Sequence, residues 1–133
     1  MIAYIVILQA DLFLAKLALE SLADRFDLTG VSLVDHLDSA VEKVARVPQD
    51  GKDLVVITGD VVGYMDMETG MVTVGGKNAD DVAMAVKAVR PDAKVFIFST
   101  SDEERRFVNG RIPKTVDDLR NFISKYKSVS LIR

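Results

Sequence analysis

The sequence predicts an α/β domain in which helices cover both faces of a parallel sheet of about five strands. Short apolar runs alternate with amphipathic segments of helical period along nearly the whole chain. The apolar runs are continuous rather than alternating, as is typical of strands that are buried on both faces. With 133 residues, the chain has the length of one domain, residues 1–133, and can bury a proper core.

The first half of the sequence supplies three strands and two helices. Apolar residues at helical spacing predict a helix over residues 12–26, with Asp11 placed to cap it. Asp38 is expected to cap a second helix, which ends before Pro48. The predicted strands are residues 4–8, 31–34 and 54–58.

An irregular segment, residues 61–75, follows the third strand. It alternates partly between apolar and polar residues and has Glu68-Thr69-Gly70 near its middle, which is a hairpin signal. We therefore expect an inserted hairpin before the next helix. Asn78 or Asp80 can cap that helix. Its expected apolar face is Val82, Ala85, Val86 and Val89.

The last part of the chain contains a fourth strand at residues 95–98 and a final helix that begins at Thr115, with Asp118 three residues on. Between them, residues 102–106 can form one helical turn and residues 106–108 a very short fifth strand. The core face of the final helix is predicted to be Val116, Leu119, Phe122, Ile123 and Tyr126. The C-terminal tail, residues 128–133, has the composition of a spare strand.

Composition excludes several classes of function. The formal charge of −3 and the pI near 5.1 provide no basic surface for nucleic acid or anionic lipid. The absence of cysteine excludes disulfides, thiolate catalysis and cysteine-ligated zinc. The apolar start is too short to cross a bilayer and lacks a basic segment or a cleavage site, so we expect a cytoplasmic protein without membrane contact.

Several short segments resemble response-regulator receiver domains, which have a flavodoxin-like fold. The apolar run before Gln9, the run Leu54-Val55-Val56-Ile57-Thr58 and the segment Phe96-Ile97-Phe98-Ser99-Thr100 match family segments in the right order. The likeness covers most of the chain and implies the family's doubly wound parallel sheet. The long insertion at 61–75 and a shortened segment between Ser99 and Pro113 depart from the family pattern, and the latter implies a shortened fourth helix.

The resemblance also implies that the family's chemistry is lost. Thr58 stands at the position of the phosphoaccepting aspartate, and a threonine hydroxyl cannot form an acyl phosphate. Gln9 and Ala10 replace the acidic pair that binds magnesium, leaving only Asp11. Magnesium at such a site needs at least two carboxylates together with phosphate oxygens.

Of two further family positions, one keeps the expected residue type and the other does not. Ser99 matches the hydroxyl switch residue, whereas Ile112 occupies the place of the lysine before Pro113. The resemblance therefore implies a pseudo-receiver with no catalytic residue, no metal and no cofactor. Its degenerate phosphoacceptor pocket would consist of Gln9, Ala10, Asp11, Thr58, Asp60, Ser99, Ile112 and Pro113.

The leading hypothesis is a non-catalytic regulatory module that acts by protein–protein contact, with a protein partner or a second copy in a homodimer. Methionine suits adaptable binding surfaces, and exposed hairpins can associate by edge pairing. The inserted hairpin supplies the main candidate surface, with the segment from Ser101 to Pro113 and the tail as others. The hairpin residues concerned are Tyr64, Met65, Met67, Met71 and Val72.

Two alternatives keep chemistry at the strand ends. A divalent ion, a phosphate or another small ligand could bind among Asp11, Thr58, Asp60 and Ser99, because open α/β sheets bind ligands there. An atypical receiver could instead be phosphorylated on Asp60. The ordinary role of an aspartate at this position is to cap or order the hairpin that follows.

The remaining motifs favour structural roles. Gly75-Gly76-Lys77-Asn78 lacks the spacing and the hydroxyl of a phosphate-binding loop, so we interpret it as a turn before a capped helix. His36 has no second histidine and is expected to be a loop residue at a strand end. The charge run Glu103-Glu104-Arg105-Arg106 is typical of a solvated face.

Overall fold

In a computed structural model of the protein, five parallel strands form one sheet in the order β2-β1-β3-β6-β7. The structure describes residues 3–9, 13–26 and 28–127. The predicted fold class is confirmed. The sheet strands are β1 (Ala3–Leu8), β2 (Val31–Val34), β3 (Asp53–Thr58), β6 (Lys94–Phe98) and β7 (Gly110–Ile112). The helices are α1 (Phe13–Leu22), α2 (Leu37–Arg46), α3 (Ala79–Val89) and α4 (Val116–Lys127).

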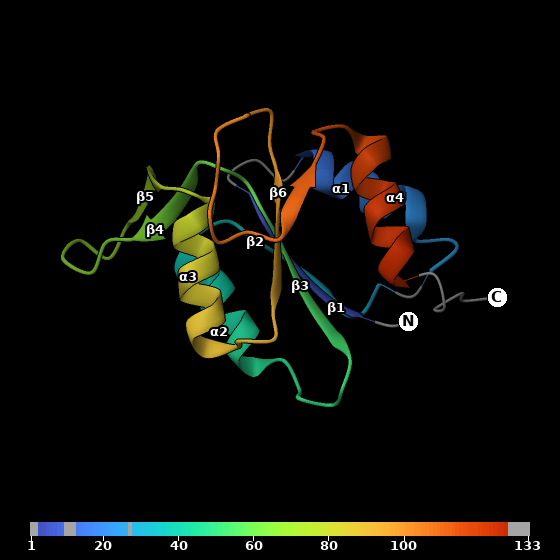
Figure 1. The fold of residues 1–133 in the computed structure, drawn as a ribbon, viewed down its shortest axis with the longest axis horizontal. Helices are drawn as coiled ribbons and strands as arrows, with labels where there is room; N and C mark the ends of the chain where they lie inside the picture. The colour runs from blue at the N-terminus through green and yellow to red at the C-terminus, as the bar shows by residue number, and fades with distance from the viewer. Residues whose placement is uncertain (1–2, 10–12, 27, 128–133) are drawn as a thin grey trace.

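Two helices cover each face of the sheet, so the core is divided into two layers (Figure 1). Successive side chains of a strand point to opposite faces. Ile5 and Ile7 of β1 therefore pack in the layer with α1 and α4, whereas Val6 and Leu8 pack in the layer with α2 and α3. The continuous apolar runs of the sequence follow from this two-sided burial.

The inserted segment forms the predicted hairpin from β4 (Val62–Met65) and β5 (Val72–Lys77). It extends away from the five-stranded sheet beside α3 (Figure 1). Gly70 adopts a φ of 70° in its turn, as the turn signal indicated. Gly75 and Gly76 have φ values of 83° and 84° at a bulge, where the pairing of β4 with β5 shifts register.

The structure corrects two predictions in the first half of the chain. Helix α1 ends at Leu22 rather than near Phe26, although Phe26 remains buried. Asp38 lies within the first turn of α2, and its carboxylate accepts a hydrogen bond from the backbone N–H of Met65 instead of capping the helix. The proposed cap of the first helix, Asp11, lies outside the described residues.

The N-termini of α3 and α4 are capped as predicted. Asn78 and Asp81 form a capping box at α3, and the hydroxyl of Thr115 accepts a hydrogen bond from the N–H of Asp118 at α4. Val89 is 41% exposed, however, whereas Ala83 is buried in its place on α3. The predicted core face of α4 lies in the layer shared with α1.

The segment between β6 and β7 differs most from expectation. Residues 99–109 contain no helix, so the predicted helical turn at 102–106 is wrong. The helix that we expected to be shortened in this segment is absent. The fifth strand of the sheet runs from Gly110 to Ile112 instead of 106–108. The tail at 128–133 lies outside the described residues. No helix in the described part of the chain is long and apolar enough to cross a membrane.

Candidate functional site at the carboxyl ends of the strands

Three of the predicted pocket residues meet where β1, β3 and β6 end. Gln9 directly follows β1, Thr58 is the last residue of β3, and Ser99 directly follows β6. The Gln9 side chain is buried, and its Nε2 donates to the carbonyl of Phe98 at 3.3 Å. Thr58 is also buried and donates its hydroxyl to the carbonyl of Gly59 at 2.9 Å. Neither side chain offers an anionic oxygen to a ligand.

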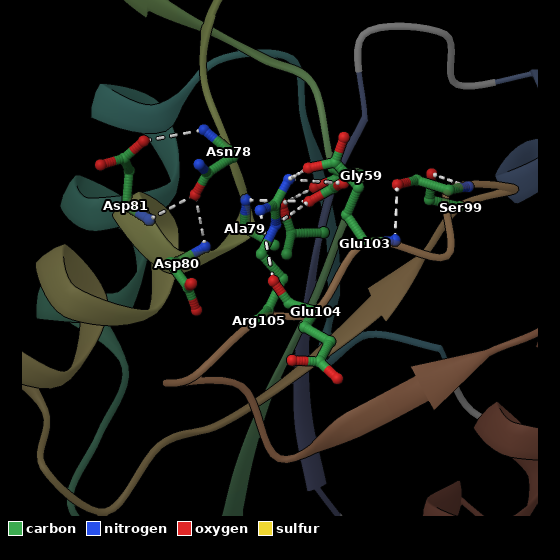
Figure 2. Close-up of polar contacts among 12 residues, drawn as sticks. Gly59, Asn78, Ala79, Asp80, Asp81, Ser99, Glu103, Glu104 and Arg105 are labelled. Atoms are coloured by element: carbon green, nitrogen blue, oxygen red, sulfur yellow. Dashed lines mark hydrogen bonds and ion pairs between the residues drawn. The ribbon is translucent and has the colours of Figure 1, made fainter.

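Asp60 lies two residues after the end of β3, and its buried carboxylate is paired with Arg105. The guanidinium binds the carboxylate in a bidentate manner, with Nε donating to Oδ1 at 2.7 Å and an Nη donating to Oδ2 at 2.9 Å. The two side chains are only 3% and 14% exposed, for Asp60 and Arg105 respectively. Figure 2 shows Arg105 reaching across to the start of α3 near Ala79.

The electrostatics of this pair follow from its hydrogen bonds. The Arg105 guanidinium lowers the pKa of Asp60 below its ordinary value, and the hydroxyl of Ser101 and the N–H of Ala79 act in the same direction. Burial opposes them but does not prevail. The pKa of Arg105 is raised in turn by Asp60. Both groups are therefore charged at neutral pH, and the carboxylate has its countercharge within the chain.

We call residues 99–109 the strap, because this segment is bound along α3. The Asp80 carboxylate accepts hydrogen bonds from the N–H groups of Arg106 and Phe107 at 3.1 and 2.9 Å. Farther along the helix, the Lys87 ammonium donates to the Phe107 carbonyl at 2.9 Å. Val108 packs against the core layer that α3 shares with α2. The strap thus holds Arg105 from a fixed backbone beside the residues that follow the strand ends. We call this set, Gln9, Thr58, Asp60 and Ser99, the crevice.

The other predicted pocket residues that the structure describes, Ser99, Ile112 and Pro113, carry no charge. The hydroxyl of Ser99 accepts a hydrogen bond from the backbone N–H of Ser101 at 3.1 Å. Ile112 is buried in the layer beneath α1 and α4, and Pro113 is exposed. Ala10 and Asp11 lie outside the described residues, so the structure does not place them.

Two interpretations of the sequence require correction here. Asp60 does not order the hairpin, because its carboxylate is bound to Arg105 and to the N–H of Ala79. The charge run at 103–106 is not wholly solvated, because Arg105 is largely buried. The available sequence signal was an acidic residue close behind an apolar strand, because a carboxylate that becomes buried there needs a hydrogen-bonding or charged partner. Sequence spacing alone cannot choose Arg105 from the other basic residues.

The His36 region has an arrangement that resembles a catalytic triad only in composition. His36 Nδ1 lies 2.8 Å from Asp35 Oδ1, but the Ser39 hydroxyl lies 2.8 Å from Nε2 and 3.2 Å from Nδ1. An oxygen at similar distances from both ring nitrogens cannot lie along the lone pair of Nε2, so proton abstraction is not supported. His36 precedes α2 and pairs with Gly63. The described residues contain no cluster of three or more metal-ligating side chains.

The hairpin exposes apolar side chains, in contrast to the crevice. Met67 is 87% exposed and Met71 is 69% exposed, whereas Tyr64 and Met65 are half-buried. Val72 is partly exposed beside them. Val61, at the base of the hairpin, is a further exposed apolar residue that the sequence analysis did not include.

Comparison with known proteins gives a structural likeness without a sequence match. No protein-family model matches the chain, and no curated protein matches its sequence. A crystal structure of a response regulator receiver protein from Dyadobacter fermentans superposes with a TM-score of 0.57. The match covers 92% of this chain and 95% of that chain at 15% sequence identity. At this identity the likeness concerns the fold, and the chain has the fold of response-regulator receiver domains.

Proposed function

We propose that this protein is a cytoplasmic, receiver-like regulatory module that acts through protein–protein contact and is not phosphorylated on an aspartate. The observation that carries the proposal is the bidentate ion pair between Asp60 and Arg105. It occupies both oxygens of the carboxylate that would otherwise bind an ion or accept a phosphoryl group. Thr58, at the phosphoacceptor position, is fully buried. This arrangement also disfavours the two alternatives that place chemistry at the crevice.

The hairpin is the surface we propose for association. Met67 and Met71 lie on a projecting element where a partner can cover both, and burial of apolar area drives association. The bulge at Gly75 and Gly76 interrupts the β5 edge, and bulges hinder edge-to-edge pairing. We therefore favour contact through the methionine side chains over extension of the sheet, with a second copy or another protein as the partner.

The test places a charge on the hairpin and measures association. Met67→Glu and Met71→Glu should weaken self-association, or binding to a partner once one is known, because a buried unpaired carboxylate is costly. Analytical ultracentrifugation over a range of protein concentrations measures the first property. Met84→Glu is a matched control, since Met84 is 56% exposed but lies on α3.

The possible outcomes distinguish association through the hairpin from association through another surface. Weaker association in both hairpin variants, with Met84→Glu unchanged, supports the hairpin as the contact. If the wild-type chain associates and all three variants associate equally well, the hairpin is not the contact surface. If the wild-type chain is a monomer at every concentration, the homodimer form of the proposal is wrong.

A further inference from the structure

The geometry points to a guanidinium-binding site at Asp60 that Arg105 fills from within the chain and that an arginine side chain of another protein can fill in its place. This inference does not depend on the hairpin or on the absence of phosphorylation. It concerns what the crevice recognises, and it gives the site a definite class of ligand.

The shape of the Asp60 site matches a guanidinium. A planar guanidinium matches a carboxylate with two parallel hydrogen bonds, whereas an ammonium can act only as a point charge. The Asp60 carboxylate is 3% exposed and receives both bonds, at 2.7 and 2.9 Å. The N–H of Ala79, at the start of α3, also donates to Oδ1 at 3.4 Å. The acceptor is therefore held in place by an element other than the strap.

The position of Arg105 places its guanidinium within reach of the surface. It belongs to a part of the strap without helix or strand, and it enters the crevice from the surface, with 14% of its side chain exposed. The neighbouring part of the strap has separate attachments, since Asp80 holds the N–H groups of Arg106 and Phe107. These attachments are made by the backbone of the next two residues and do not involve the Arg105 side chain. An incoming guanidinium would reach Asp60 along the path that Arg105 vacates.

The experiment removes the internal ligand and supplies it from outside. Arg105→Ala is titrated with N-acetylarginine amide, with N-acetyllysine amide as the control, and the amide signal of Ala79 and the thermal midpoint are recorded. We expect saturable shifts at Ala79 and a raised midpoint with the arginine compound only. The double variant Asp60→Asn/Arg105→Ala should not respond. The wild-type chain should respond much more weakly, because tethered Arg105 competes at a high effective concentration.

Each other outcome overturns the inference. Equal responses to the arginine and lysine compounds would show that only charge matters. A response that persists in the double variant, or that is equally strong in the wild-type chain, would place binding elsewhere. If Arg105→Ala is unfolded, the arginine compound should refold it by mass action. Failure to refold it, or the absence of any saturable response in the folded variant, would contradict the site.

Discussion

The crevice and the hairpin differ in how far their functional side chains are exposed to solvent. At the crevice, Asp60 and Arg105 satisfy one another and are almost removed from solvent. On the hairpin, Met67 and Met71 are exposed. In a receiver fold the strand-end edge is expected to meet ligands, yet here it is internally neutralised. This difference is the basis of our proposal that the hairpin is the association surface, whereas the carboxylate at the strand ends already has a partner within the chain.

The comparison also separates stability from recognition. Removing one partner of a buried ion pair destabilises the folded state, because the remaining charge has neither water nor a countercharge beside it. An exposed methionine can be replaced at little cost to folding, because it is already in contact with water. Substitutions at the two regions should therefore affect different measurements.

The largest expected effect is the loss of the countercharge at the crevice. Arg105→Gln should lower the free energy of unfolding by about 3 kcal/mol, near the lower end for a broken buried pair because Arg105 retains some exposure. Urea denaturation measures this change. The neighbouring exposed residue provides the control, and Arg106→Gln should change stability by about 0.5 kcal/mol or less. Equal losses in the two variants would show that the ion pair is not the distinguishing feature.

The same pair predicts a dependence on pH. The folded-state pKa of Asp60 is lowered from 3.8, so its ionised form is favoured by folding. This contribution is fully present above the unfolded-state pKa and is lost as the pH falls through the folded-state pKa. The stability difference between wild type and Asp60→Asn should therefore be greatest near neutral pH and decline in acid. A difference that is independent of pH would contradict the assigned role of the ion pair.

A smaller effect is expected from glycines in the hairpin. Gly76→Ala should destabilise the protein by about 1–2 kcal/mol, because its φ of 84° disfavours a side chain. An added Cβ would also lie 3.2 Å from Tyr64 Cε1. Gly70→Ala measures the cost of the positive φ alone, since Gly70 has a φ of 70° and no atom lies within 4 Å of the added Cβ. Urea denaturation should show the greater loss for Gly76→Ala, and the reverse order would refute the role of the Tyr64 contact.

The smallest effect on stability is expected at the exposed methionines. Met67→Glu should change the free energy of unfolding by about 0.5 kcal/mol or less, because the side chain is 87% exposed. Urea denaturation at a protein concentration below any association measures this directly. A large loss would show that Met67 supports the fold of the monomer, and the contrast between the two regions would fail.

The sequence predicted the elements whose periodicity is strong, and it was less successful where tertiary contacts decide. The apolar run at residues 54–58 indicated β3 because both faces of that strand are buried. Glu68-Thr69-Gly70 located the hairpin turn because Gly70 needs a positive φ. Arg105 was missed because its burial depends on Asp60, which is 45 residues away in sequence. The strap likewise has its bonds to α3 rather than within a helix, so no local period could reveal it.

The most direct test of the central claim is an amide NMR spectrum of the labelled protein with and without magnesium and beryllofluoride, a mimic of an aspartyl phosphate. Because Asp60 is bound by Arg105 and position 58 is a threonine and not an acid, we predict that the spectra coincide. Saturable shifts concentrated at Thr58, Asp60 and Ser99 would show that the crevice accepts a phosphoryl group. That result would contradict the proposal that this receiver fold works without aspartyl phosphorylation.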